Sequence, residues 1–489
     1  MPTHPQTVPD SGSNPPPGLS SAAVDASCRW PVLILFSVAT LWLALGGLLG
    51  LIASIKAHAP GFMAAPGWLT YGRVRPASSN AIVYGFILQA GLGVTLWMVC
   101  RLGRTLLQGG WMILAAAGFF NLGLTIGIVW ILAGGSTSYE WLELPGAVTP
   151  ILFSAYVLIA AWAISNLHQR ERRLLYVSQW FLLTSLFWFP WVYSTAQVLL
   201  VHFPGRGVTQ AVVSGWYAHN LFELCLSGFG LAIIFYFLPK LLRRPLHSGS
   251  LALLLLVLEC SLPAGRRSGR RTGAKLAEQR GGSRPRLPDF APFGVRDDWY
   301  RTWASGRGES KGDVVLRFIL VAAGSYLLAA ALETIAIQPP INRTVVFTLF
   351  YQGLAQLKIH GFLAISLAGA IYFIGPRIAG RDWAWPRFIP LHFWTAVAGM
   401  ALTATGLVIG GVVQGVGINH PETEFIKVVR SCLPFLGLST LGATLLLVSY
   451  TVFCLQLWRL VSLACACCCR VGHADSVRLA AGTKEGARL

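Results

Sequence analysis

Residues 347–378 read FTLFYQGLAQLKIHGFLAISLAGAIYFIGPRI, and this stretch decides the fold. It is longer than the roughly 20 residues that a helix needs to cross the hydrocarbon core of a bilayer. It is apolar on all sides and lacks the alternation of a strand, which predicts a transmembrane helix. Because successive helical residues are rotated by about 100°, we expect Leu354 and Gln356 to face nearly opposite sides of this helix.

The same pattern recurs along the 489-residue chain, which is 54% hydrophobic and 12% charged, with a mean hydropathy of +0.60. These values are typical of polytopic membrane proteins rather than large soluble domains. The sequence therefore predicts an all-α, polytopic transmembrane helix bundle with about ten readable spans. The apolar runs fall at about 31–55, 81–100, 110–134, 146–165, 177–201, 213–238, 316–337, 345–374, 388–412 and 432–460.

Basic residues gather in the connections that follow the second, fourth and sixth runs, whereas the connection 134–146 has none. Lys and Arg accumulate in the cytoplasmic loops of membrane proteins. We therefore expect both termini in the cytoplasm. The net charge of +19 has the same explanation, so we predict a lipid bilayer and no nucleic acid among the partners.

The two ends of the chain differ from the bundle in composition. Residues 1–30 are rich in Pro and Ser, which predicts a disordered tail. Residues 465–489 form a Cys-rich cytoplasmic tail, with four cysteines just beyond the last run. These cysteines are too close together for a tetrahedral metal site of the usual paired spacing, so we interpret them as a membrane-edge feature without a catalytic role.

Residues 251–315 interrupt the pattern and divide the bundle into a first part, 31–250, and a second part, 316–464. An apolar start, LALLLLVLEC, gives way to a segment rich in Arg, Gly, Ser and Pro that cannot span a bilayer. One interpretation is a pair of compensating frame errors that replaced two helices. The alternative is a genuine basic cytoplasmic loop.

Several short motifs support a family resemblance. They are STAQ at 194–197, GWYAHN at 215–220, FYFLPK at 235–240, GAIYFIGPRI at 369–378 and WAWPRFIPLHFW at 383–394. With them the chain resembles subunit I of the C-family (cbb-type) heme-copper cytochrome c oxidases. The resemblance implies twelve transmembrane helices, two hemes and a copper ion, and a place in an aerobic respiratory chain of the cell inner membrane. The implied partners are membrane-bound cytochrome c subunits.

The residues that ligate heme in this family are replaced here. The resemblance places one low-spin heme ligand in an Arg-Pro-x-His motif, where this chain has Ser78. It places the other low-spin ligand and the high-spin ligand in a His-Ala-His triplet, which reads Leu354, Ala355, Gln356 here. Imidazole is the expected iron ligand at these sites. We therefore predict that no heme is bound and that the protein is catalytically degenerate.

One copper-ligand position is retained. His219 matches the first copper ligand of the resembling family, but the other two histidines would fall within 251–315, and no histidine occurs between His247 and His360. A single imidazole does not make a stable copper site, so we interpret His219 as vestigial. The pair His219 and Glu223 shares a helical face. It is either a proton-relay or metal site, or a neutral histidine beside a protonated or cavity-facing carboxyl.

Two further polar residues lie within apolar runs. His360 either contacts a cofactor or is a buried histidine satisfied by a neighbour, and the second interpretation is favoured. Glu333 is expected near the outer end of its span, reaching the membrane interface.

Three functions remain open on this basis. The chain is a heme-free relative of oxidase subunit I, an active terminal oxidase subunit that reduces dioxygen and pumps protons, or a transporter or channel on the same scaffold. The replaced heme ligands favour the first.

Overall fold

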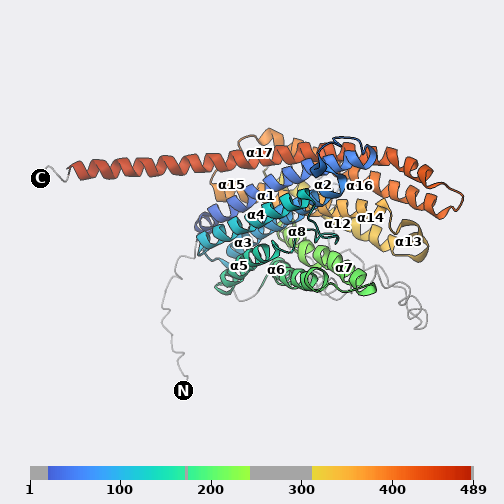
Figure 1. Cartoon of the computed structure of the whole chain (residues 1–489). Coiled ribbons are helices and arrows are strands. Elements are labelled where there is room, and N and C mark those ends of the chain that lie inside the picture. Colours follow the sequence, from blue (N-terminus) through green and yellow to red (C-terminus); the bar gives the residue numbers. More distant parts are fainter. Residues whose placement is uncertain (1–19, 171–174, 243–310, 486–489) are drawn as a thin grey trace, which may run out of the picture.

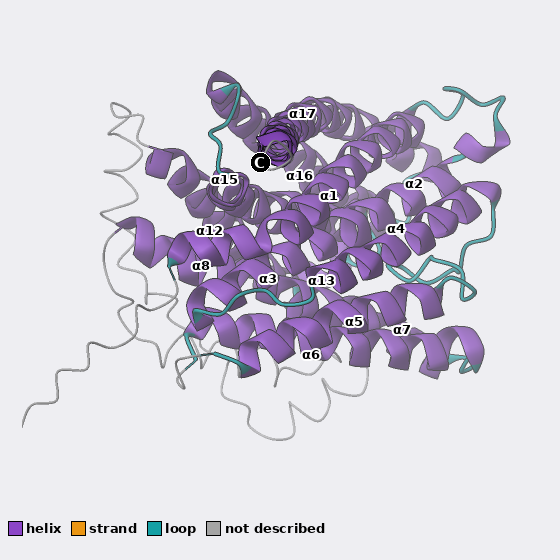
Figure 2. Ribbon diagram, turned by 90° about the vertical axis from the view of Figure 1, so that its left-hand side faces the viewer, coloured by secondary structure: helices purple, strands orange, loops and turns teal. Residues whose placement is uncertain are grey.

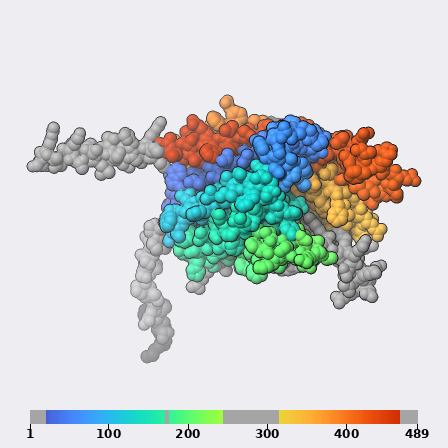
Figure 3. Space-filling model, in the orientation of Figure 1, coloured from blue at the N-terminus to red at the C-terminus, as the bar shows by residue number. Residues whose placement is uncertain are grey.

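The computed structural model describes residues 20–170, 175–242 and 311–485, and those ranges contain helices and connecting loops but no strand (Figure 2). This confirms the predicted all-α class. The helices run broadly along one direction and form a bundle, with α17 lying along one side (Figure 1; Figure 3). Residues 243–310, which hold most of the anomalous interval 251–315, lie outside the described residues.

The first part of the bundle comprises helices up to residue 242. They are α1 (Ser21–His58), α2 (Tyr71–Asn80), α3 (Gln89–Gly103), α4 (Gly110–Ala133), α5 (Thr149–His168), α6 (Val177–Ala196), α7 (Val208–Asn220) and α8 (Ser227–Leu242), with the short helix η1 (Gly67–Leu69). The second part comprises α12 (Lys311–Ala336), α13 (Pro339–Val345), α14 (Leu349–Gln356), α15 (Ile365–Ala379), η7 (Pro386–Phe388), α16 (Ile389–Asn419) and α17 (Phe425–Glu485).

Nine helices in the described part of the chain are long and apolar enough to cross a membrane. The tenth expected run, at 177–201, is also helical and forms α6 and the start of η3, but its sequence is rich in Trp and polar residues and falls below the same hydropathy. The ten expected spans are therefore all helical in the described residues, and nine of them are strongly apolar.

Several element boundaries differ from the sequence-based expectation, and two of them lie at the ends of the bundle. α1 begins at Ser21, not at residue 31, so residues 21–30 are helical rather than part of a disordered tail. Polar residues lower the hydropathy there, yet Asp25 is held by Trp97 and Arg101 of α3. At the other end α17 continues as one helix to Glu485, beyond the expected end of the apolar run at residue 460 and into the expected tail 465–489.

The most deeply buried spans are those that carry Ser78 and the triplet Leu354–Gln356. The apolar window of Tyr71–Gly103 is 100% buried and that of Leu349–Ala379 is 94% buried, whereas the window of Gly110–Ala133 is only 44% buried. The first two therefore form the centre of the bundle, and the peripheral helices present apolar side chains where lipid would lie.

Four π-helical segments interrupt the long helices in the described residues: η2 (Ala81–Leu88), η3 (Gln197–His202), η4 (Leu221–Leu226) and η6 (Leu357–Ala364). Three of them begin within three residues of Ser78, His219 and Gln356. Segments of π-helix are rare and occur frequently at functional sites. The backbone is therefore irregular beside Ser78, His219 and Gln356, the positions that the sequence analysis singled out.

Candidate functional site: two cavities on either side of one helix

The continuous helix formed by α14 and η6 separates two cavities. The large cavity has a volume of about 780 Å³ and is lined by Leu354, among other residues. The small cavity has a volume of about 150 Å³ and is lined by Gln356. The two side chains therefore face different cavities, as their spacing of two residues predicted.

Ser78 and Gln356 come together at the small cavity, although 278 positions separate them in the sequence. Ser78 lies on α2, is buried, and donates a hydrogen bond of 2.7 Å from Oγ to the carbonyl oxygen of Gly46 on α1. A methyl group added at Gly50 would lie 2.9 Å from the same hydroxyl oxygen. The serine thus serves close packing between α1 and α2.

His360 also lines the small cavity, one turn beyond Gln356 on η6. Its Nδ1 lies 2.5 Å from the hydroxyl oxygen of Tyr450 on α17, and both side chains are buried. This contact agrees with the interpretation of His360 as a buried histidine satisfied by a neighbouring helix.

The large cavity contains an ion triad that the sequence did not reveal. The ammonium of Lys358 on η6 pairs with the carboxylates of Glu223 on η4 and Glu333 on α12, the second at 2.8 Å. The side chains of Lys358, Glu223 and Glu333 are only 13%, 19% and 22% exposed to solvent. Glu333 therefore points into the bundle towards Lys358, and the expectation that it reaches the membrane interface is wrong.

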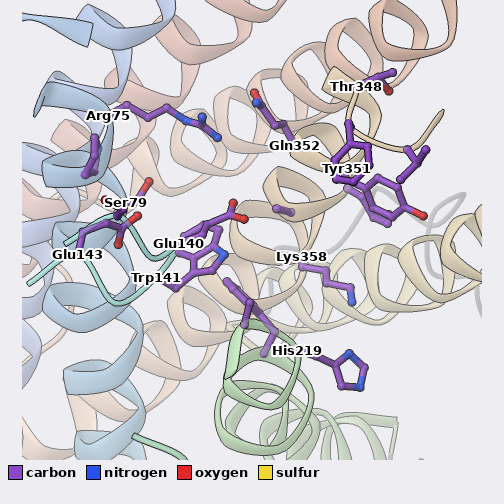
Figure 4. A pocket seen from close by; sticks show the side chains of 18 of the residues that line it. Arg75, Ser79, Glu140, Trp141, Glu143, His219, Thr348, Tyr351, Gln352 and Lys358 are labelled. Atoms are coloured by element: carbon purple, nitrogen blue, oxygen red, sulfur yellow. The ribbon is translucent and has the colours of Figure 1, made fainter. Parts of the chain in front are cut away.

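Lys358 lies one helical turn after Leu354, and both line the large cavity. Residues four apart on a helix lie on the same face. The ammonium is consequently close to the helix face of Leu354, one of the two triplet positions at which the resemblance places a heme ligand. Figure 4 shows Lys358, His219 and Glu140 around this cavity.

His219 and Glu223 both line the large cavity, as their shared helical face predicted. The carboxylate of Glu223 forms an ion pair with Lys358, so His219 and Glu223 do not form an isolated pair. Among the described residues, no group of three or more His, Cys, Asp or Glu side chains is placed to hold a metal ion.

The wall of the large cavity opposite Lys358 is formed by α2 and the connection between α4 and α5. Asn80 donates a hydrogen bond of 2.8 Å from Nδ2 to Oε2 of Glu143, and both residues are buried. Burial raises the pKa of the Glu143 carboxyl, an effect that the hydrogen bond from Asn80 opposes in part. The neutral form of Glu143 is therefore favoured relative to an exposed glutamate.

Two aromatic residues with positive φ border the large cavity: Trp141 (φ 68°) and Phe347 (φ 61°). Positive φ is strained for bulky residues and is held only where surrounding contacts fix it. The carbonyl of Trp141 accepts a hydrogen bond of 2.6 Å from the hydroxyl of Tyr84. The buried hydroxyl of Tyr217 lies 2.6 Å from that of Tyr84 and joins the same network. Phe347, in contrast, is 96% exposed.

Comparison with known proteins assigns the scaffold. A family model described as Cytochrome C and Quinol oxidase polypeptide I matches residues 31–262 and 290–445. The chain belongs to this family. The unmatched residues between the two segments, 263–289, fall inside the anomalous interval 251–315.

Individual relatives agree with the family assignment. The chain is 23% identical over 463 residues to the cbb3-type cytochrome c oxidase subunit CcoN1 of Stutzerimonas stutzeri, covering 91% of this chain and 97% of that protein. It is 23% identical over 478 residues to a bacteroid cytochrome c oxidase subunit 1 homolog of Bradyrhizobium diazoefficiens, covering 91% and 83%. The oxidase subunit I resemblance, read from short motifs, is thereby confirmed.

A solved structure supports the fold. One chain of a heme-copper terminal oxidase dimer, determined by cryo-EM, matches with a TM-score of 0.64 at 12% identity, covering 88% of this chain and 84% of that one. The protein is therefore a multi-pass membrane protein of the heme-copper oxidase subunit I type.

The residues around the small cavity do not fit a heme. Ser78 and Gln356 offer no imidazole, and the hydroxyl of Ser78 is already engaged with Gly46. The imidazole of His360, which also lines this cavity, is engaged with the hydroxyl of Tyr450. The volume of about 150 Å³ is also below the range of about 300–1,000 Å³ that small-molecule sites occupy.

The residues around the large cavity do not fit the heme and copper pair either, although its volume is sufficient. Leu354 has no donor atom, and the neighbouring cation Lys358 is paired with two carboxylates that would otherwise be available to a metal. His219 alone supplies an imidazole among the lining residues. Copper requires several nitrogen ligands in fixed geometry.

Proposed function

We propose that this chain is a heme-free, catalytically degenerate relative of cytochrome c oxidase subunit I that serves as a structural component of a membrane respiratory complex. The observation that carries the proposal is the Lys358 triad in the large cavity. A buried ammonium requires carboxylate partners, and here it lies one turn from Leu354, where the resemblance places a heme ligand.

Charge balance supports a stable arrangement without metals. In the family, the positive charge of this region would come from iron and copper. In this chain one lysine supplies positive charge between two glutamates, so Glu223 and Glu333 remain partly compensated. The small cavity is stabilised by different contacts. Ser78 donates a hydrogen bond to the carbonyl oxygen of Gly46 on α1, and His360 forms a hydrogen bond with Tyr450 on α17.

The proposed partners are membrane-bound cytochrome c subunits, and the proposed location is the cell inner membrane with both termini in the cytoplasm. The family assignment supports the first part, since relatives are subunits of cytochrome c oxidases. The concentration of Arg and Lys after the second, fourth and sixth apolar runs supports the orientation.

For residues 251–315 we propose that compensating frame errors replaced two family helices. The family match leaves out only residues 263–289 of this interval, which supports a local change there, whereas residues 251–262 and 290–315 are matched. Resequencing the gene tests this idea: an alternative reading frame should encode two apolar runs of about 20 residues. A frame without them would establish a genuine basic loop.

The functional proposal is tested by purifying the full chain, with an affinity tag, from membranes of its native host in mild detergent. We expect c-type cytochromes to copurify, with no b-type heme signal in the reduced spectrum. A b-type signal in stoichiometric amount with dioxygen consumption would instead establish an active terminal oxidase. Recovery without any cytochrome would contradict the proposed partners.

A further inference from the structure

A cluster of basic side chains lies at one end of the bundle, where α3, α8 and α15 meet. α15 packs against both α3 and α8, and Arg101, Lys240 and Arg377 extend from the last turns of these three helices. We call these three residues the basic cluster. Asp25 of α1 is their acidic neighbour, since it pairs with Arg101 at 3.3 Å.

The charges of the basic cluster are not balanced within the described part of the chain. Asp25 accepts a hydrogen bond of 2.9 Å from the indole nitrogen of Trp97 and pairs with Arg101, which occupies both of its carboxylate oxygens. Lys240 and Arg377 form no ion pair with any described residue. Three cations and one carboxylate leave a net charge of +2.

Neutral groups hold the two unpaired cations in place. The Lys240 ammonium lies 5.0 Å, and the Arg377 guanidinium carbon 3.4 Å, from the centre of the Phe373 ring. Lys240 also donates a hydrogen bond of 2.8 Å to the hydroxyl of Tyr236, and Arg377 donates one of 2.6 Å to the carbonyl of Phe373. Both cations are exposed, so a ligand can reach them from outside the bundle.

We propose that the basic cluster binds the headgroup phosphate of an anionic phospholipid. Two cations that share one aromatic ring repel each other, and an anion between them would remove that repulsion. A guanidinium matches a phosphate with two parallel hydrogen bonds. The cluster lies where three spanning helices end, at the depth of lipid headgroups, and basic pockets between spanning helices bind anionic headgroups.

The expected orientation agrees with this occupant. Arg101 and Lys240 belong to the basic loop regions that the charge distribution assigns to the cytoplasmic side. The cytoplasmic leaflet carries anionic lipid, and each basic residue near such a surface contributes about 1 kcal/mol. At about 1.4 kcal/mol per tenfold change, removing one cation should weaken lipid binding about fivefold.

The experiment uses the full chain in nanodiscs of phosphatidylcholine with a minor fraction of phosphatidylglycerol, and native mass spectrometry counts retained lipids. We expect retained phosphatidylglycerol on the unaltered protein, about fivefold weaker retention for Lys240→Gln, and about 30-fold weaker retention for Lys240→Gln with Arg377→Gln. The matched control is Arg343→Gln. Arg343 is exposed and lies on α13, before the other end of the span whose last turn carries Arg377, so its removal should leave retention unchanged.

Three results would overturn the proposal: equal retention of phosphatidylcholine, equal loss in the Arg343→Gln control, or displacement of the lipid by millimolar inorganic phosphate. The last would identify a site for free anions. Lys240→Gln alone keeps the test valid if the double variant does not fold, because Lys240 is exposed and its aliphatic chain is not part of the core.

Discussion

Replacing Lys358 with methionine should destabilise the protein strongly, because it leaves two buried carboxylates without their cation. At 2.8 Å and an effective dielectric constant of about 20, one such pair corresponds to about 6 kcal/mol of Coulomb attraction. Desolvation offsets much of this. Removal of one partner from a buried ion pair typically costs about 3–5 kcal/mol. Since the three side chains keep 13–22% of their exposure, we expect about 3 kcal/mol.

The assay is thermal unfolding of purified protein in one detergent at pH 7, and the expected result is a midpoint lower by several degrees. A matched control is Lys427→Met, which breaks the pair between Lys427 and Glu424 at 3.4 Å. That pair is 67% and 66% exposed, so its loss should cost less than about 1 kcal/mol.

A triple variant separates charge imbalance from lost packing. Glu223→Gln and Glu333→Gln, combined with Lys358→Met, remove all three charges and should recover most of the lost stability. The reasoning is refuted if Lys358→Met unfolds like the Lys427→Met control. It is also refuted if the triple variant is as unstable as the single one.

Two further predictions concern the walls of the site. Burial raises the pKa of Glu143, so the contribution of this carboxyl to stability is complete below its ordinary pKa of 4.5 and is lost as the pH rises through the raised value. Glu143→Gln should remove this decline in the unfolding midpoints measured between pH 4 and pH 8. An unchanged pH profile in the variant would count against this prediction. Gly411→Ala would place a methyl group against the backbone nitrogen of Phe350 and 2.6 Å from its Cα, which should cost about 3 kcal/mol by forcing α14 away from α16. Gly118→Ala is the control, because no atom lies within 4 Å of the new methyl group, and this variant should unfold no earlier than the unaltered protein. Similar unfolding midpoints for the two alanine variants would contradict the close approach of α16 to α14 at Gly411.

The sequence predicted the bundle because apolar length is sufficient to identify a spanning helix. It also predicted that Leu354 and Gln356 face different sides, because helical geometry fixes their angle. Residues 21–30 were assigned to the tail because their polar side chains lower the hydropathy of the segment. The bond between Trp97 and Asp25 that anchors them joins residues 72 positions apart and cannot be read from a local pattern.

Lys358 was the main omission in the sequence-based account of the site. Its partner Glu223 is 135 positions away, and no pattern in one sequence shows which faces of two spans meet. A signal was nevertheless present, since a charge inside an otherwise uncharged span is costly and marks a functional or paired position. The same reasoning applies to Glu143 and Asn80, which are 63 positions apart.

The heme and copper content of the purified full chain tests the central claim most directly. A pyridine-hemochrome spectrum measures heme b per polypeptide, and elemental analysis of the same sample measures copper. A purified cbb3-type subunit from Stutzerimonas stutzeri provides the positive control. We predict well under one heme b and one copper per chain, because Ser78, Leu354 and Gln356 offer iron no imidazole. Two hemes b and one copper per chain would contradict the account.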